Sequence, residues 1–219
     1  MNAAYIQDKD PAYPGLKKQI IVCESGKFDK APRSDFDISY DQKSVKPGTG
    51  LLEKQCSGAY LGPVAHEVIQ AAVKEGLFSK KFSESLAAIE SLTLIEIDSF
   101  LHAPYRTASV LGAKAAECAT EEDYDILHQL LDAIVDRSAR LSASILTACV
   151  VKSGQGKNAT KPVCILCDGT TFYKTHKIAM RVQGYLEDLL LRQRGLFYEI
   201  VSRDNDITLG TAIGGLMGK

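Results

Sequence analysis

The order of apolar and polar positions along the chain predicts strands near both ends and helices between them. Near the start, residues 3–7 and 19–23 are rich in apolar and β-branched side chains, and Asp-Pro and Pro-Gly pairs lie between them. Turn-forming pairs between two such runs indicate a β-hairpin. Residues 35–41 alternate polar with apolar side chains, and this period of two predicts a further strand with one solvated face.

The middle of the chain, residues 49–152, changes to the spacing that is typical of helices. Gly58, Gly62 and Pro63 indicate a kink or break early in this region, and Gly76 is a helix stop. The later predicted helices cover residues 82–90, 98–112 and 121–152. We therefore expect a block of helices between the two strand regions.

The C-terminal part of the chain predicts a strand–helix–strand unit. The apolar runs 162–167 and 196–202 flank a helical pattern over 176–192, and a glycine-rich helix is expected over 208–217. A helix is the usual connection between two parallel strands. The sequence therefore predicts one α/β domain over residues 1–219, with a mainly helical middle at about 49–152.

The charge pattern narrows the possible partners. The chain has 219 residues, with 26 Lys plus Arg and 27 Asp plus Glu, and no block of like charges that would follow a phosphate backbone or an anionic membrane. No apolar run approaches the ~20 residues of a membrane span, and the first residues do not form a signal peptide. We therefore expect a cytoplasmic protein that binds neither nucleic acid nor a membrane.

The cysteines and histidines give no pattern of a metal or triad site. The six cysteines lie in or beside apolar runs, which is typical of reduced, packed thiols. Cys164 and Cys167 have CxxC spacing, but in a strand they face opposite sides, so no zinc site is predicted. The four histidines are scattered without a nucleophile partner, and His66 and His128 are expected on helix surfaces.

Candidate binding residues follow two predicted strands, where the loops of an α/β sheet gather ligands. Glu24 comes directly after the strand over 19–23, and the strand over 162–167 is followed by the turn Asp-Gly-Thr-Thr at 168–171. Plainer interpretations exist for each: Glu24 as a solvated loop residue, and Asp-Gly as a common turn pair. Glu53 lies in the first turn of a predicted helix, where the helix dipole alone favours a carboxylate.

Several runs resemble those of hexokinases of the eukaryotic type, and the similarity extends over essentially the whole chain. Residues 53–62 read EKQCSGAYLG, close to the EKMISGMYLG of the family. Residues 21–28 resemble its NMEWGAF, residues 2–5 its TNACY strand, and residues 168–174 its DGTLYK. The resemblance implies the large C-terminal subdomain of the hexokinase-type, actin-like ATPase fold, also called ribonuclease H-like: an α/β structure with a mixed sheet and a helical insertion.

Carried over residue by residue, the resemblance implies two groups of binding residues. A hexose is a ring of hydroxyl donors, and charge-assisted bonds to carboxylates contribute roughly 1.5–3 kcal/mol each. The residues implied for the sugar are Asn2, Glu24 and Glu53. Those implied around the adenosine and phosphates of ATP are Gly58, Lys81, Gly169 and Thr170.

The departures from the family pattern limit what is implied. The phosphate loop at the N-terminal end of the family, its Thr-Lys sugar loop and the segment with its catalytic Asp would all lie before Met1, so no catalytic residue is assigned. Ser25 replaces the family's Trp, and residues 204–210 differ from its Ser-Gly-Lys-Gly turn. Because the chain opens within a family motif, we expect a piece of a longer protein or the product of a shortened reading frame.

The leading hypothesis is therefore the C-terminal half of an ATP-dependent hexokinase that phosphorylates a hexose, such as glucose, at its 6-hydroxyl. Its expected partners are the hexose, ATP and the missing N-terminal lobe, with Mg²⁺ in the intact enzyme, and the chain alone is expected to be nearly inactive. Two alternatives stay open. One is a non-catalytic module that senses a sugar or nucleotide, and the other is a structural α/β domain whose acids only face solvent.

Overall fold

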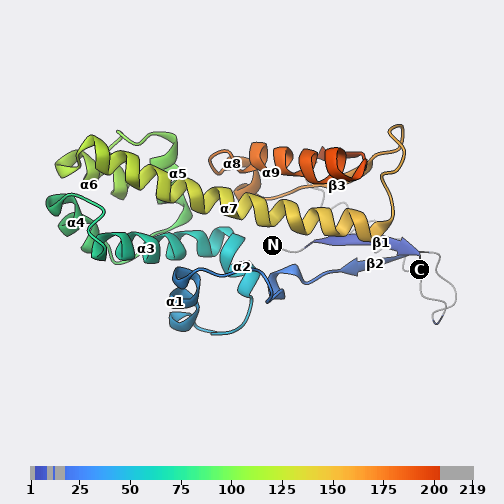
Figure 1. The fold of residues 1–219 in the computed structure, drawn as a ribbon, viewed down its shortest axis with the longest axis horizontal. Helices are drawn as coiled ribbons and strands as arrows, with labels where there is room; N and C mark the ends of the chain where they lie inside the picture. Colours follow the sequence, from blue (N-terminus) through green and yellow to red (C-terminus); the bar gives the residue numbers. More distant parts are fainter. Residues whose placement is uncertain (1–2, 9–11, 13–17, 203–219) are drawn as a thin grey trace.

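One long helix organises the fold. The structure, a computed structural model, describes residues 3–8, 12 and 18–202. Helix α7 (Glu121–Ser153) runs along most of the molecule and contacts elements from both ends of the chain (Figure 1). It begins with a capping box, in which the Thr120 side chain accepts from the Asp123 amide and Asp123 accepts from the Thr120 amide. This confirms the long helix predicted over residues 121–152.

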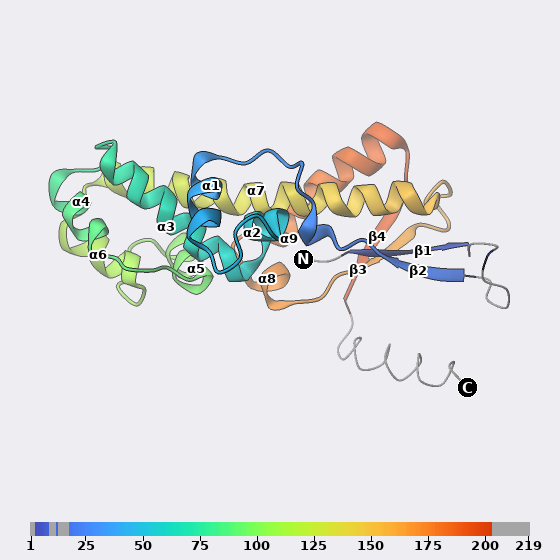
Figure 2. The same ribbon diagram turned by 90° about the horizontal axis from the view of Figure 1, so that it is seen from below.

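A β-hairpin lies at one end of α7 (Figures 1 and 2). Strand β1 (Ala4–Asp8) pairs antiparallel with β2 (Lys18–Val22), which confirms the predicted hairpin. Tyr5 and Ile21 are opposite one another and half-buried, whereas the next pair, Ile6 and Ile20, is exposed. One face of the hairpin therefore packs on the molecule, since β1 contacts α7.

The strand predicted over residues 35–41 is wrong, because this segment forms helix α1 (Asp35–Lys43). It follows the 3₁₀ turn η1 (Ser25–Lys27) and begins with a capping box between Ser34 and Asp37. Asp37 and Asp41 are four residues apart and both are buried. The alternating acids that looked like a wet strand face are thus the inner face of a helix, where cations from other elements bind them.

Helices α2 (Leu51–Cys56) and α3 (Gly58–Lys74) are separated by one residue, Ser57. The predicted break falls there, and Pro63 remains inside α3. The predicted stop at Gly76 is confirmed: its φ is +71°, its amide donates to Val73 O, and the Leu77 amide donates to Ala72 O. These two bonds form the helix end in which glycine is the usual left-handed residue.

Three further helices complete the helical end of the molecule. They are α4 (Lys80–Ala87), α5 (Leu94–His102) and α6 (Val110–Cys118). The single helix predicted over residues 98–112 is wrong, because α5 ends at His102, before Pro104, and α6 begins only at Val110. The side chains of Phe82, Phe100 and Leu127 are completely buried in the core that these helices share with α3 and α7.

The C-terminal unit has the predicted order. Strand β3 (Val163–Leu166) pairs parallel with β4 (Tyr198–Val201), and between them lie α8 (Thr170–Lys174), α9 (Ile178–Leu186) and a π-helical continuation, η2 (Glu187–Arg192). Helix α9 packs against α7. The helix predicted over residues 208–217 lies outside the described residues.

The described strands form two separate two-stranded sheets, one antiparallel and one parallel. No helix within the described ranges is long and apolar enough to cross a membrane.

Candidate functional site

Glu24 lies where β2 leaves the hairpin. Its backbone is left-handed, with φ 48° and ψ 40°, a conformation that costs a residue with a Cβ roughly 1–2 kcal/mol. The side chain is about half exposed, at 54%, and its Oε2 is 3.1 Å from Lys27 Nζ. An ion pair this exposed contributes little stability. The Glu24 carboxylate is therefore held at the surface by the turn and is open to a ligand.

Glu53 lies in the first turn of α2, directly against that turn. A Cβ placed on Gly26 would be 3.0 Å from Glu53 Cβ and 3.4 Å from its Oε2, so only glycine lets the two segments approach this closely. In the described part of the chain, no hydrogen bond or ion pair engages the Glu53 carboxylate. The structure thus brings Glu24 and Glu53 together on two segments that pack against each other.

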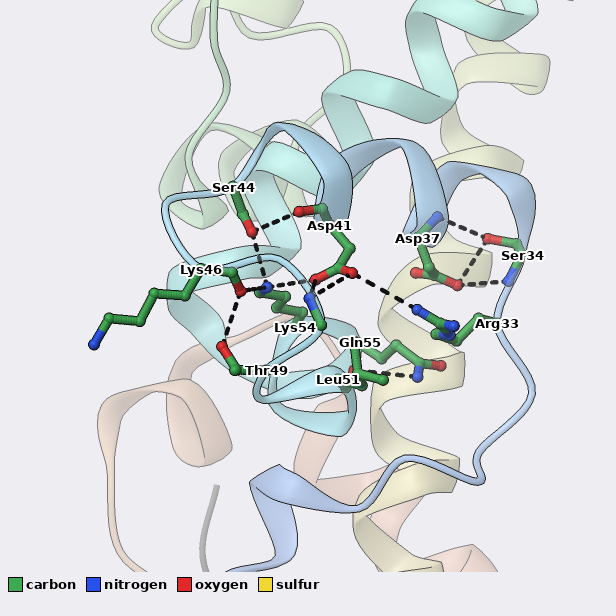
Figure 3. A network of polar contacts seen from close by, with 11 residues as sticks. Arg33, Ser34, Asp37, Asp41, Ser44, Lys46, Thr49, Leu51, Lys54 and Gln55 are labelled. Carbon is green, nitrogen blue, oxygen red and sulfur yellow. Dashed lines mark hydrogen bonds and ion pairs between the residues drawn. The ribbon is translucent and has the colours of Figure 1, made fainter.

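A buried polar network around Lys54, the residue after Glu53, holds α2 in place (Figure 3). The Lys54 side chain is buried, and its Nζ donates to Asp41 Oδ1 at 2.5 Å, to Ser44 Oγ at 2.8 Å and to Lys46 O at 2.8 Å. All three hydrogens of the ammonium group are therefore used. The network ties α2 to the end of α1 and to the loop that joins them.

Asp41 is the acidic centre of this network. Burial alone would raise the pKa of its carboxyl, but hydrogen bonds from Lys54 and the Gly48 amide, and the charges of Lys54 and Arg33, outweigh burial and lower the pKa. The Gly48 amide donates to both carboxylate oxygens, at 3.0 and 3.2 Å. Asp41 therefore stays ionised, and it fixes the loop that precedes Glu53.

The start of β1 is anchored to the same turn. Asn2, the third residue expected at the sugar, lies outside the described residues. Its neighbour Ala3 donates its amide to the buried Ser25 Oγ at 3.2 Å, and Ala3 O accepts from the Cys23 amide at 2.9 Å. Ser25, which stands where the family has Trp, thus has a structural role in joining β1 to the Glu24 turn.

A second pocket, of about 620 Å³, lies just beyond α2, between the start of α3, α5 and α8. Gly58, Thr170 and Lys174 line it. A Cβ on Gly58 would be 2.4 Å from Thr171 Oγ1, so the first turn of α3 lies against the side chains of α8, and any larger residue there would have to displace the Thr171 hydroxyl. The pocket therefore joins Gly58 and Thr170, which were predicted at the nucleotide.

A second close contact, between α3 and the segment that contains Leu92 and Thr93, lies beside this pocket. A Cβ on Gly62 would be 2.4 Å from Leu92 O and 2.5 Å from Thr93 Cα, so α3 lies directly on the backbone that leads into α5. Gly169, which precedes α8, has φ +112°, a conformation that favours glycine. Residues 168–171 were predicted as a turn that carries candidate binding residues; in the structure α8 already begins at Thr170.

The structure does not bring Lys81 to this pocket. Lys81 is exposed in the first turn of α4, at the end of the molecule far from the hairpin, whereas α8 lies near the middle (Figure 1). Among the described residues that line this pocket, the lysine is Lys174. Sequence reasoning missed Thr93, which also lines the pocket and caps α5. Its capping-box spacing to Glu96 is the signal that would have located this end of the helix.

Three of the four histidines, although scattered along the sequence, lie close together beside the pocket. The His176 ring lies 4.8 Å from that of His102 and 6.4 Å from that of His128. Asp98, which lines the pocket, accepts from the His176 amide at 2.7 Å. Burial, followed by the charges of Lys177 and His102, lowers the pKa of His176, and its Nε2 is buried without a hydrogen-bond partner.

The described residues contain no group of three or more His, Cys, Asp or Glu side chains that could hold a metal ion. We therefore derive no step of the chemistry through a metal bound by this chain.

Comparison with known proteins gives the class and then the family. The structure superposes on the hexokinase from Schistosoma mansoni complexed with glucose, with a TM-score of 0.69 at 22% identity, covering 92% of this chain and 47% of that one. A second solved hexokinase gives a TM-score of 0.67. The fold is thus the α/β fold of these solved hexokinases.

The amino-acid sequence identifies the family. It matches the Hexokinase family over residues 1–217, and the chain belongs to that family. Hexokinase-1 of Schizosaccharomyces pombe is 28% identical over 231 residues, which cover 97% of this chain and 46% of that protein. Glucokinase-1 of Kluyveromyces lactis is 32% identical over 168 residues, covering 71% and 35%. The chain spans about half or less of the length of these relatives.

Proposed function

We propose that this chain supplies the carboxylates of a hexose site and the adenosine side of an ATP site in a hexokinase. The reaction is transfer of the terminal phosphoryl group of ATP to the 6-hydroxyl of a hexose such as glucose. The observation that carries the proposal is the position of α2: Glu53 in its first turn lies against the η1 turn that Glu24 precedes, and the Gly58 pocket lies just after its end.

The length of α2 suits a transfer between two bound molecules. Glu53 lies in α2, and Gly58 begins α3 only two residues after α2 ends at Cys56, so the two residues lie on consecutive elements. A sugar held by Glu53 and a nucleotide held beside Gly58 would therefore be neighbours without being in the same pocket. The buried network around Lys54 keeps this spacing fixed, which is what positioning catalysis requires.

The proposed role of Glu24 and Glu53 is to accept hydrogen bonds from sugar hydroxyls. Two carboxylates on contacting segments can bind and orient a hydroxylated ring. Among the described residues, Glu24 has only an exposed ion pair with Lys27, and the Glu53 carboxylate has no hydrogen bond or ion pair, so both can accept hydrogen bonds from a ligand. The proposed role of the Gly58 pocket is to hold the adenosine, with Thr170 and Lys174 as polar groups at its wall. Gly169 stays a predicted contact on the neighbouring backbone, and Lys81 stays a prediction, although it is not among the residues that line the Gly58 pocket.

The proposal assigns the proton transfer and the remaining phosphate contacts to the other half of a hexokinase. In an intact enzyme, Mg²⁺ bound with ATP would supply positive charge that neutralises the phosphates. The chain by itself is proposed to bind without catalysing, because loss of a general base alone lowers a rate by about 10² to 10⁴. A cytoplasmic location is part of the same proposal.

Isothermal titration of the chain with glucose, and separately with a nonhydrolysable ATP analogue, tests both sites. We expect Glu53→Gln and Glu24→Gln to weaken glucose binding about tenfold or more while binding of the nucleotide is retained. Glu84→Gln is the matched control, because Glu84 is exposed on α4 at the far end of the molecule. Equal glucose binding by all four proteins would instead support a structural domain whose acids only face solvent.

A coupled assay with glucose, ATP and Mg²⁺ tests whether this chain binds its ligands without catalysing the reaction. We expect no turnover above background from this chain, and clear turnover would show that it holds its own catalytic base. The same assay on the full-length product of the gene separates the enzyme from a sensor. Binding of both ligands without turnover by that product would favour the sensing module.

A further inference from the structure

A pair of cysteines lies directly behind the Glu24 turn. Cys23 Sγ is 3.6 Å from Cys149 Sγ, although the two residues are 126 positions apart. Cys23 is exposed and follows the last residue of β2, whereas Cys149 is buried on α7. All six cysteines lie in the described part of the chain, and no other two of them are in hydrogen-bond contact there. The expectation that all the thiols are packed is therefore wrong for Cys23 and for Cys164, which is also exposed.

The two sulfurs share an apolar pocket that is open to solvent. This pocket, of about 370 Å³, lies between the hairpin, η1 and α7, and Cys23, Cys149 and Lys152 are among its lining residues. A small uncharged oxidant can enter such a pocket and reach the exposed Cys23 sulfur. The backbone of Cys23 is held by its hydrogen bond to Ala3 O, so the thiol stays next to α7.

We propose that Cys23 and Cys149 form a dithiol site that reacts with a peroxide and closes to a disulfide, which ties the end of β2 to α7. The sulfurs are already in contact at 3.6 Å, and closure to the bonded distance of about 2.05 Å requires them to approach by about 1.5 Å. Nothing in the proposed sugar or nucleotide chemistry uses either thiol. The inference therefore stands apart from the proposed function, although the bond would form next to Glu24.

The two cysteines have different parts in the reaction. Burial, and then the hydrogen bond shared with Cys23, raise the pKa of Cys149 to about 12, so Cys149 remains a thiol at neutral pH. The accessible Cys23 meets the oxidant first: its thiolate attacks one peroxide oxygen, the O–O bond breaks, and Cys23 becomes a sulfenic acid with release of water. Cys149 sulfur then attacks the Cys23 sulfur, the S–O bond breaks, and the thiol proton leaves with the hydroxide as water. Two thiols are oxidised and one peroxide is reduced to two waters.

The experiment treats the fully reduced chain with hydrogen peroxide near neutral pH and follows it by intact mass, thiol counting and peptide mapping under non-reducing conditions. We expect loss of two thiols and two hydrogens, a single cross-linked peptide that joins Cys23 to Cys149, and reversal by a dithiol reductant. Cys164→Ser is the matched control, because Cys164 is exposed like Cys23 but has no sulfur neighbour. It should oxidise at the wild-type rate.

Single variants separate the role of Cys23, which reacts with the peroxide, from that of Cys149, which closes the disulfide. Cys23→Ser should lose the cross-link, and Cys149→Ser should stop at a Cys23 sulfenic acid that a cyclic 1,3-dione traps. Circular dichroism checks that each variant is folded, and Cys149→Ala is a second variant if the buried serine unfolds the chain. A bond mapped to any other pair, or Cys23 over-oxidised in the folded wild-type chain without a cross-link, would overturn the proposal. Neither readout uses sugar or nucleotide, so failure here leaves the proposed function untouched.

Discussion

The two ends of α2 are held in place by different kinds of interaction. On the sugar side, a buried ammonium and carboxylate, Lys54 and Asp41, fix the helix through hydrogen bonds to the loop before it. On the nucleotide side, Gly58 and Gly62 let α3 lie directly against Thr171 and the backbone of Leu92. One end is thus positioned by charge and the other by close approach.

This difference predicts how each end fails. A site positioned by buried charge is sensitive to removal of one partner and to strong acid, because the remaining charge is left uncompensated. A site positioned by glycine contacts is sensitive to volume, because protein interiors have no room for an added methyl group. The predictions below use this contrast, and a variant that disturbed both ends equally would contradict it.

The largest effect is expected from Asp41→Ala. It leaves the buried Lys54 ammonium without its carboxylate, and we expect a loss of about 3–5 kcal/mol in the free energy of unfolding, measured by denaturant titration. The double variant with Lys54→Met should recover part of this loss. Lys43→Ala is the control: its partner is Glu67, but the Lys43 side chain is 64% exposed, so it should cost less than about 1 kcal/mol. An equal cost for both would show that burial of the pair is unimportant.

The next effect is expected from Gly62→Ala. The new methyl group would meet Leu92 O at 2.4 Å and Thr93 Cα at 2.5 Å, and because these are backbone atoms the chain between α4 and α5 must move. We expect a loss of about 3 kcal/mol, again from denaturant unfolding. Gly184→Ala in α9 is the matched control. An added Cβ there meets nothing within 4 Å, and the change should be neutral or stabilising by up to about 1 kcal/mol.

A smaller effect is expected from Gly58→Ala, where the added Cβ meets a side-chain hydroxyl that can rotate. We expect a cost of about 1 kcal/mol in stability and a loss of about tenfold in affinity for a nonhydrolysable ATP analogue, with glucose affinity unchanged. Thr171→Ala added to Gly58→Ala removes the 2.4 Å contact and should restore stability. If glucose affinity fell as far as nucleotide affinity, the two ends of α2 would not be independent.

The sequence predicted the elements that have either a long apolar periodicity or a clear local turn signal. The hairpin, the helix α7 and the parallel strand pair follow from apolar periodicity and turn pairs, and each is confirmed. Helix α1 was missed because its acidic residues were interpreted as the solvent-facing positions of a strand. The sequence does not show that Asp37 and Asp41 are instead buried against cations from other helices. Only the fold reveals that Arg137, a hundred residues away, donates to Asp37 at 2.7 and 2.9 Å.

The candidate site was predictable from resemblance more than from local pattern. Glu24, Glu53, Gly58 and Thr170 were selected by their motifs, and the structure places them in two neighbouring groups around α2. Lys81 shows the limit of that approach, since matching short runs did not place it at the pocket. The contacts among His102, His128 and His176 had no signal in the sequence, because they depend on how three separate elements pack.

The smallest expected effect distinguishes the two ends by pH. The pKa of Asp41 is lowered, so its contribution to stability is complete above the ordinary value of about 3.9 and is lost only as the pH falls through the folded-state pKa. The pKa of His176 is lowered as well, chiefly by burial. In the unfolded chain His176 has the higher pKa, so it binds a proton there before it does in the folded chain. The free energy of unfolding should therefore begin to fall below about pH 6.5.

The groups that face His176 set the size of this effect. His102, Lys177 and Arg181 oppose its protonation, whereas Asp132 favours it. Unfolding free energies measured from about pH 8 to about pH 5 should decline modestly for the wild type, and His176→Leu should flatten that decline, because a side chain that cannot titrate replaces the buried ring. His66→Gln, at a histidine that instead contacts Ile89 O, should keep the wild-type profile. A decline that survived His176→Leu unchanged would assign the acid sensitivity to another part of the molecule.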